Sequence, residues 1–155
     1  MATPTPIALD AVAKRIIALL QRDGRMSYAA IGKDVGLSEA AVRHRVQRLT
    51  EQGVIDIVAV TDPIQLGFAR QAMIGIRATG ALEPLADELA ELPEVDYVVI
   101  TAGSYDLLVE VVCESDAHLL ELVSDRIRRH PSVLSSETFM YLKLAKQTYT
   151  WGVPD

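Results

Sequence analysis

The sequence predicts an α+β protein made of two domains, a winged-helix-like helix-turn-helix domain followed by a ferredoxin-like βαββαβ domain. Residues 1–60 carry apolar side chains at helical spacing, separated by glycines and helix-capping residues. The remaining residues alternate β-branched runs with amphipathic helical segments. Charge is divided in the same place: residues 1–60 hold 8 Lys and Arg against 6 Asp and Glu, net +2, whereas residues 61–155 hold 7 against 15, net −8. We therefore expect the two domains to have different partners.

Three helices are expected in the first domain, residues 1–60. Each has a residue that can cap its N-terminus, namely Asp10, Ser27 and Ser38. Each is followed by a glycine that can end it, namely Gly24, Gly36 and Gly53. The second helix is short, and a single residue separates Gly36 from Ser38, so the second and third helices should meet in a tight turn. This order is the helix-turn-helix arrangement.

A strand, a linker and a βαββαβ unit are expected after the third helix. The β-branched run "VIDIVAV" predicts a strand over residues 54–60, and "DP" opens a linker over residues 61–67. The second domain, residues 68–144, is expected to hold strands at 71–79, 95–102, 107–113 and 133–144 and helices at 82–92 and 117–129. Residues 145–155 form a tail, in which Tyr149 and Trp151 are candidates for packing on a neighbouring subunit.

Both faces of the predicted sheet carry apolar side chains. In "LLVEVVC", Leu107, Val109 and Val111 point to one face, while Leu108 and Val112 point to the other. Two helices can cover only one face, and a chain of 155 residues has no further element for the second. We therefore expect another copy of the same sheet to cover it, which predicts a homodimer.

The third helix is strongly basic in a chain whose formal net charge is −6. Its stretch "LSEAAVRHRVQRL" places three arginines and a histidine in six positions, outside the apolar stripe of Val42, Val46 and Leu49. Small residues at its N-terminal end allow close approach to base edges, Arg and Gln can pair with guanine and adenine, and the helix N-terminus can receive a phosphate. The residues expected to contact double-stranded DNA are Ser38, Ala40, Ala41, Arg43, His44, Gln47 and Arg48.

Other interpretations of this helix stay open. Outward arginines often form only a solvated surface, although the capped short helix and tight turn before them favour DNA binding. A protein that bends or wraps DNA with little sequence preference would use the same face. Arg45 lies at the border of the apolar stripe, so an ion pair with Glu51 or Asp56 is an alternative to DNA contact. A domain of net charge +2 binds DNA weakly, so at least two copies per duplex are expected.

Taken together, these motifs resemble the Lrp/AsnC family of transcriptional regulators, also called feast/famine proteins. The resemblance rests on "LDAVAKRIIALLQRDGRMSYAAIGKDVGLSEAAVRHRVQRLTEQGVID", on "DPIQLG", and on "TAGSYDLLVEV" followed by a helix and "VLSSETFMYLK". It implies a DNA-binding domain joined to a ligand-sensing and oligomerisation domain. It also implies dimers that assemble into tetramers or octamers, with small effectors, often amino acids, bound between subunits. The effector-binding positions it implies are Gly103, Ser104, Tyr105, Asp106, Ser136 and Thr138.

The chemistry of this loop is compatible with a small zwitterion. The carboxylate of Asp106 can accept an ammonium group, and the amides around Gly103 can donate to a carboxylate. Ser136 or Thr138 of an adjacent chain would complete such a site. "GSYD" is equally an ordinary hairpin turn, in which the glycine adopts a positive φ and the aspartate bonds to its own backbone. Both alternatives remain open, and the sequence does not specify the effector.

Metal and thiol chemistry are disfavoured. Cys113 is the single cysteine and ends an apolar strand, so a disulfide is excluded within the chain and a core position is expected for the thiol. The three histidines, His44, His118 and His130, lack metal-ligand spacing. No phosphate-binding glycine loop or nucleophile elbow is present. We therefore expect no metal, no cofactor and no enzymatic activity.

One enzymatic alternative remains open, and the sequence also predicts where in the cell the protein is found. Siroheme decarboxylases have a similar two-domain architecture and need basic and histidine side chains facing a cavity in the second domain, and Arg70 and Arg77 are the only such charges on the first strand. The sequence shows no signal peptide and no apolar run approaching ~18 residues, so a cytoplasmic protein that does not contact membranes is expected.

Overall fold

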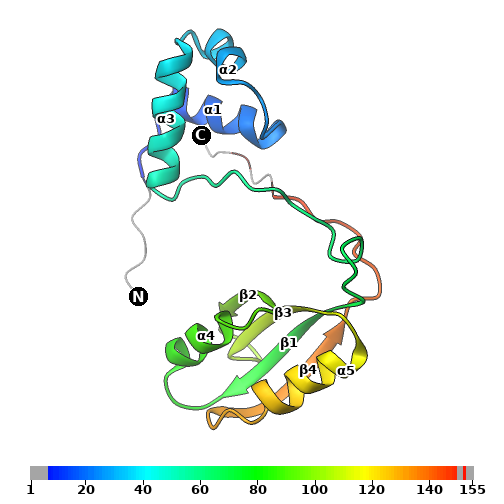
Figure 1. Ribbon diagram of the computed structural model, residues 1–155. Coiled ribbons are helices and arrows are strands. Elements are labelled where there is room, and N and C mark those ends of the chain that lie inside the picture. Colours follow the sequence, from blue (N-terminus) through cyan, green and yellow to red (C-terminus); the bar gives the residue numbers. More distant parts are fainter. Residues whose placement is uncertain (1–6, 150–151, 153–155) are drawn as a thin grey trace. The chain divides into compact units, whose positions relative to one another are not determined.

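The computed structural model describes residues 7–149 and Gly152, and the chain divides into two compact units. One unit is formed by the chain up to Ala59 together with the segment from Lys146 onward, and the other by Val60–Ala145. The first holds three helices and the second holds the sheet (Figure 1). Tyr149 is 55% exposed, and Trp151 lies outside the described residues. Among the residues described, no helix combines the length and the apolar character that crossing a membrane requires.

The helical unit contains α1 (Ala11–Arg22), α2 (Tyr28–Val35) and α3 (Glu39–Glu51). Each helix begins after its predicted cap: the side chains of Asp10, Ser27 and Ser38 accept hydrogen bonds from backbone N–H groups three residues further on. The apolar stripes of the three helices meet inside the unit. The buried residues of this core are Ala13, Ile16, Ile17, Leu19, Leu20, Ile31, Val42, Val46 and Leu49.

Two glycines make the tight turn between α2 and α3. Gly36 has a φ of +73°, in the left-handed region that suits glycine. Gly32 is buried, and a Cβ atom built on it would overlap the carbonyl oxygen of Leu37. The Leu37 N–H in turn donates to the Gly32 carbonyl at 2.9 Å. A residue without a side chain at Gly32 therefore allows the turn to fold directly against α2.

The strand predicted over residues 54–60 is wrong. This segment is described without any strand; Val54 and Ile55 pack on the helical core, and the residues after them are exposed, Val58 by 72%. β-Branched residues favour extended backbone, but a strand also needs a partner for its hydrogen bonds. No described strand of the chain pairs with this run.

The second unit is a four-stranded antiparallel sheet with helical segments on one face. Its elements are β1 (Arg70–Ala78), α4 (Leu82–Ala90), β2 (Val95–Ile100), β3 (Leu107–Cys113), α5 (Asp116–Glu121), the π-helix η1 (Leu122–Ile127) and β4 (Val133–Met140). The strand order β2-β3-β1-β4 and the βαββαβ succession confirm the predicted ferredoxin-like fold. The last strand ends four residues earlier than predicted, and the second helix changes from α to π geometry at Leu122.

One face of the sheet packs on the helices and forms the core of this unit. Ile74 and Ile76 of β1 and Val109 of β3 are fully buried there, together with Leu85 of α4. Cys113 belongs to the same core, as predicted, and burial raises the pKa of its thiol. A thiol in this position is inert.

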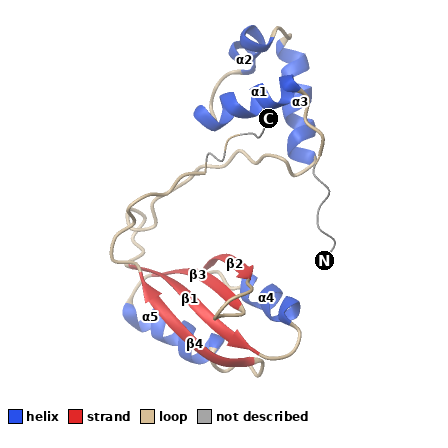
Figure 2. Ribbon diagram, turned by 180° about the vertical axis from the view of Figure 1, so that it is seen from behind, coloured by secondary structure: helices blue, strands red, loops and turns tan. Residues whose placement is uncertain are grey.

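The opposite face of the sheet carries apolar side chains together with Gln71, Glu110 and Glu137, and no described helix of this unit lies over it (Figure 2). Strand register pairs Met73 with Phe139 and Val99 with Leu108 on this side. Phe139 is 42% exposed, and Tyr97 of β2, on the same face, is 51% exposed. The prediction that both faces of the sheet carry apolar side chains is confirmed.

Candidate nucleic-acid interface and effector loop

The outer face of α3 is polar because its apolar residues are used inside the unit. Val42, Val46 and Leu49 are buried, so the opposite side of the helix faces outward. The predicted DNA contacts lie on that side: Ser38, Ala40, Arg43, His44, Gln47 and Arg48 are exposed, and Ala41 is half-buried. The structure therefore brings all seven residues together on one continuous surface.

Acidic neighbours hold two of these side chains in place. Arg43 Nη2 donates to Glu39 Oε1 at 2.8 Å, and Gln47 Nε2 donates to Glu51 Oε1 at 2.8 Å. The guanidinium of Arg43 also lies over the ring of Tyr28 at the start of α2, 5.3 Å from the ring centroid. The sequence did not indicate Tyr28 and Glu39 as part of this surface. The four-residue spacing of Glu39 and Arg43 was the one signal that could have found the first of these contacts.

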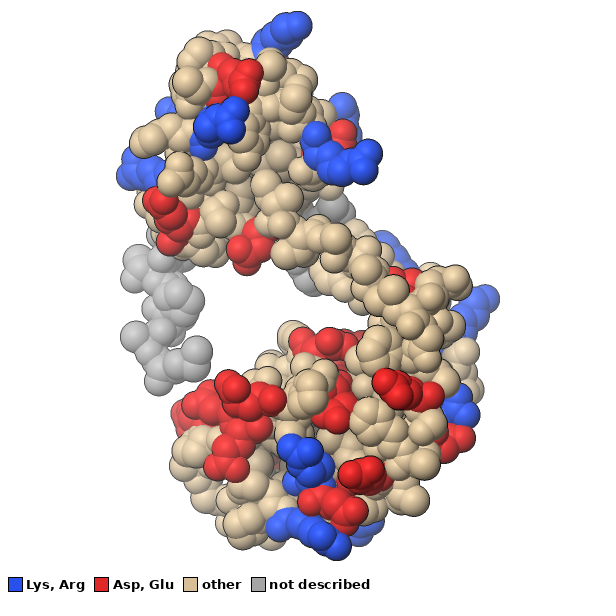
Figure 3. Space-filling model, viewed as in Figure 1, with Lys and Arg blue, Asp and Glu red and all other residues tan. Residues whose placement is uncertain are grey.

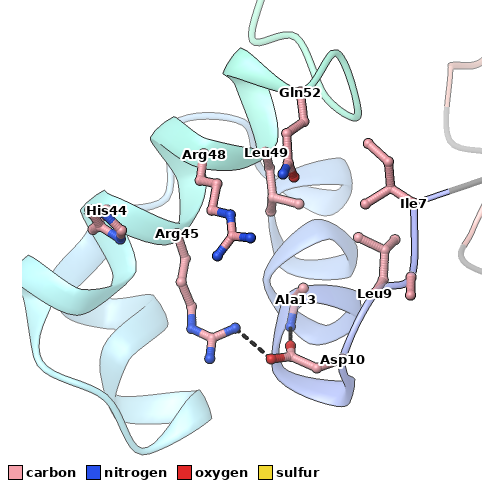
Figure 4. A pocket seen from close by; sticks show the side chains of 10 residues that line it. Ile7, Leu9, Asp10, Ala13, His44, Arg45, Arg48, Leu49 and Gln52 are labelled. Atoms are coloured by element: carbon pink, nitrogen blue, oxygen red, sulfur yellow. Dashed lines mark hydrogen bonds and ion pairs between the residues drawn. The ribbon is translucent and has the colours of Figure 1, made fainter.

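His44 and Arg48 border a hollow between α3 and the segment that precedes α1 (Figure 4). The hollow has a volume of about 370 Å³, and Leu9, Leu49 and Gln52 also line it. Within the described part of the chain, the side chains of His44 and Arg48 make no hydrogen bond or ion pair. Their N–H donors are therefore open to an anion, such as a phosphate of a nucleic-acid backbone.

Arg45 joins α3 to α1. Its Nη1 donates to Asp10 Oδ2 at 2.7 Å, while Asp10 Oδ1 accepts from the Ala13 N–H at 2.7 Å. The hydrogen bond from Arg45 lowers the pKa of the Asp10 carboxyl. The sequence indicated an ion pair of Arg45 with Glu51 or Asp56. The structure corrects the partner, because the side chain points to the start of α1 rather than along α3 (Figure 4).

The loop between β2 and β3 contains four of the predicted effector positions. Gly103 and Ser104 are exposed, whereas Tyr105 and Asp106 are half-buried. The expected positive φ at the loop glycine is wrong, because Gly103 is not among the glycines with that conformation. Asp106 Oδ2 accepts from the Ala78 N–H at 2.8 Å, at the point where the pairing of β1 with β4 shifts register. One oxygen of this carboxylate therefore serves the sheet, and the other makes no hydrogen bond within the described residues.

Tyr105 folds over the open face of the sheet. A Cβ atom on Gly75 would lie 2.7 Å from its ring, so the ring occupies the space that the glycine leaves. Its hydroxyl donates to Glu137, which raises the pKa of the tyrosine, and its ring meets Phe139 edge to face with 5.9 Å between centroids. The sequence did not indicate Glu137 or Phe139, because these contacts depend on how β4 registers with β1.

Ser136 and Thr138 lie on the other face of the sheet from Tyr105. They are directly opposite Ile76 and Ile74 in the β1–β4 ladder, and directly paired residues project to the same face. Both isoleucines belong to the core beneath the helices. Within one chain, the structure does not bring these two hydroxyls together with the loop.

One of the two arginines considered for a siroheme-binding cavity is already paired with a carboxylate. Arg70 forms a two-point ion pair with Asp116, in which Nη2 donates to Oδ2 at 2.8 Å. Arg77 is exposed. In the ranges that the structure describes, no group of three or more His, Cys, Asp and Glu side chains is arranged to hold a metal ion.

Known proteins share this architecture. Residues 9–50 match the AsnC-type helix-turn-helix domain, and residues 71–154 match the AsnC-type C-terminal dimeric α+β barrel domain. The HTH-type transcriptional regulator FL11 of Pyrococcus horikoshii is 34% identical over 144 residues, which cover 92% of this chain and 95% of that protein. The second domain match extends through most of the C-terminal tail.

Two solved structures are similar to this chain over its whole fold. AsnC of E. coli is 27% identical with a TM-score of 0.78, covering 91% of this chain and 97% of that one. The L-Met complex of a transcriptional regulator from Neisseria meningitidis is 24% identical with a TM-score of 0.81, covering 95% and 97%. Because one domain match spans more than half of the chain and the relatives match nearly end to end, the chain belongs to the AsnC (Lrp/AsnC) family of transcriptional regulators with a DNA-binding helix-turn-helix.

Proposed function

We propose that this protein is a sequence-specific regulator that reads operator DNA with the outer face of α3 and senses a small effector, an amino acid, through its sheet unit. The observation that carries the DNA part is the exposed row of Arg43, His44, Gln47 and Arg48 opposite a fully buried stripe. Figure 3 shows one face of each unit: Asp and Glu side chains gather on the sheet unit, whereas Lys and Arg alternate with fewer acidic side chains on the helical unit. DNA is polyanionic, so it favours the helical unit.

The predicted DNA contacts within α3 have three proposed roles. Ala40 and Ala41 let the helix approach the base edges closely. Arg43 and Gln47 pair with guanine and adenine in the major groove. Residues bordering the hollow, His44 and Arg48, bind backbone phosphates and fix the register of the helix on the duplex.

An operator duplex for testing this can be recovered by in vitro selection with the wild-type protein. We expect Arg43→Ala and Gln47→Ala each to weaken binding to that duplex by about tenfold, since a bidentate base contact is worth about 1–3 kcal/mol. Arg25→Ala is the matched control, because it removes an exposed arginine of the same unit away from α3. Fluorescence anisotropy gives the affinities and light scattering gives the oligomer mass. Dissociation of the oligomer by the α3 variants, or an equal loss in the control, would reject the proposed interface.

The same duplex distinguishes specific recognition from architectural binding. At matched salt, we expect the selected duplex to bind about 10³-fold or more tightly than random duplexes of equal length. A ratio near one would favour a protein that shapes DNA without reading its sequence.

A second copy of the chain is the proposed cover for the open face of the sheet. Met73, Leu108, Tyr97 and Phe139 present an apolar surface there, and burying it is favourable. The matching domain family is described as a dimeric barrel. We propose that the resulting dimers assemble further into tetramers or octamers, which would place several copies of α3 on one duplex.

The loop of residues 103–106 is the proposed effector site, and Ser136 or Thr138 of an adjacent chain would reach it from the helix-covered face of that chain's sheet. Its support is the open oxygen of Asp106, the exposed backbone around Gly103, and the L-Met that accompanies the Neisseria meningitidis regulator. Binding of an amino-acid panel can be followed through its effect on operator affinity. Asp106→Asn is the sharper variant, since the amide keeps an acceptor for the Ala78 N–H and removes the charge. We expect it to lose the effector response and to retain basal DNA binding, and an unaltered response would rule out this site.

A further inference from the structure

We propose that Tyr28 and Glu39 form a clamp that positions Arg43 for base recognition, which makes Tyr28 a specificity-determining residue outside the recognition helix. The proposal rests on the proposed function, because it assigns roles to two neighbours of a proposed DNA contact. The name Arg43 clamp is used below for the side chains of Tyr28 and Glu39.

Two helices contribute to the Arg43 clamp. Glu39 lies one turn before Arg43 on α3, and its Oε1 accepts from Arg43 Nη2 at 2.8 Å. Tyr28 is the first residue of α2, and its ring centroid lies 5.3 Å from the Arg43 guanidinium carbon. The guanidinium is therefore held at one edge by a carboxylate and on one face by an aromatic ring.

Tyr28 is itself firmly held. Its side chain is half-buried and packs against the helical core, in the same cluster as Val35 and Leu37. The close contact of Gly32 with Leu37 joins α2 to the start of α3. The ring therefore has a fixed position relative to α3, and it can act as a platform for the arginine.

The Arg43 clamp restricts the arginine without using up its donors. The Arg43 side chain is 63% exposed, so without the clamp it would sample many rotamers and lose that freedom on binding. A guanidinium has five N–H donors, and one of them is engaged by Glu39. The remaining donors can pair with guanine O6 and N7.

Glu39 gives the Arg43 clamp a second property. Its carboxylate is 54% exposed at the start of the DNA-facing helix, and Arg43 neutralises it. Without Arg43, the same carboxylate would face the phosphates as an unpaired negative charge. Loss of Arg43 should therefore cost more affinity when Glu39 is present than when glutamine replaces it.

The test is a double-mutant cycle in the full-length protein. Affinities are measured for the duplex recovered by in vitro selection and for each of its single-base-pair substitutions. Tyr28→Leu keeps apolar packing and removes the aromatic face, whereas Tyr28→Phe keeps the face and removes the hydroxyl. We expect Tyr28→Leu to weaken binding by about two- to fivefold, to relax preference at the same base pairs as Arg43→Ala, and to have no further effect when Arg43 is already alanine. Tyr28→Phe should behave as wild type, and Glu39→Gln should reduce the loss caused by Arg43→Ala.

The outcomes separate this proposal from the function on which it rests. If Arg43→Ala leaves every base preference unchanged, the proposed reading face of α3 is wrong. If Arg43→Ala relaxes a preference but the losses from Tyr28→Leu and Arg43→Ala multiply, the Arg43 clamp is wrong and the reading face stands. An equal loss in Tyr28→Phe would mean that the hydroxyl binds phosphate, which also overturns the clamp. Thermal unfolding of each variant, together with the exposed Glu39→Gln variant, keeps a folding defect apart from a recognition defect.

Discussion

The helical unit and the sheet unit leave surfaces of opposite character exposed. In the helical unit, three apolar stripes meet in a closed core, and the side of α3 that remains outside is polar and basic. In the sheet unit, the helices close one face, and the other face presents Tyr97 and Phe139. The first unit is complete as a fold and offers charge to a partner. The second offers apolar area, which indicates a partner of the same kind as itself.

The largest effect expected is on the closed core of the helical unit. Ile31→Ala removes a fully buried side chain from the junction of the three helices, and such a change costs about 2–5 kcal/mol. We expect loss of DNA binding with retention of self-association, because the sheet unit has its own core. Fluorescence anisotropy with the selected duplex measures DNA binding, light scattering measures self-association, and circular dichroism during thermal unfolding measures the loss of stability. Val58→Ala, at a position 72% exposed, is the control and should change stability little. Loss of both properties in Ile31→Ala would contradict independent units.

The next effect concerns the open face of the sheet. Phe139→Glu places a charge beside Glu137 on the surface proposed for self-association, and we expect the dimer dissociation constant to rise on the order of a hundredfold. Leu120→Glu is matched in chemistry and lies on α5, at a position that is 66% exposed. Sedimentation velocity gives the mass of each variant. Equal masses for the two variants would place the interface elsewhere.

A smaller effect is expected where Tyr105 covers Gly75. Gly75→Ala puts a methyl group within 2.7 Å of the ring, and the resulting displacement should cost about 1–3 kcal/mol. Gly103→Ala is the control in the adjoining loop, because no atom lies within 4 Å of the added carbon. Urea unfolding compares the two variants. A neutral Gly75→Ala would show that the ring is not confined by its hydrogen bond to Glu137.

The smallest effect is the acid sensitivity of Asp10. Its folded-state pKa is lowered by the hydrogen bond from Arg45, so its contribution to stability is present above the ordinary pKa of about 3.9 and is lost as pH falls through the folded value. Asp10→Asn keeps a helix cap and removes the ion pair, whereas Asp10→Ala removes both. We expect the difference in unfolding midpoint between wild type and Asp10→Asn to shrink from pH 7 to pH 3. A difference that is the same at both pH values would show that ionisation of Asp10 beside Arg45 does not contribute to stability.

Features that depend on near neighbours in the chain could be predicted from the sequence. The caps Asp10, Ser27 and Ser38, the left-handed Gly36 and the apolar stripe of α3 all follow from residues within a few positions of one another. The order of strands and helices follows from period and turn chemistry in the same way. The exposed polar face of α3 was therefore correctly placed.

Features that depend on residues far apart in the chain could not be predicted from the sequence. The pair of Arg45 with Asp10 spans 35 positions, and a basic residue at the edge of an apolar stripe could equally have met a nearer carboxylate. The contacts of Tyr105 with Glu137 and Phe139 require the register of β4 against β1. The failed strand over residues 54–60 has the same origin, since local propensity favours extension but does not create a pairing edge.

The exposed stretch that follows Ile55 is also the place where the chain is open to proteolysis and to recombination with relatives. Val58, Val60, Ile64 and Leu66 are all more than half exposed, so a protease should find its first site there while both cores stay closed. For the same reason, a fusion made at Asp56 should tolerate replacement of the three helices that precede it by those of a relative. Because the segment from Lys146 onward is grouped with the helical unit, a full exchange of that unit takes a second crossover near Ala145.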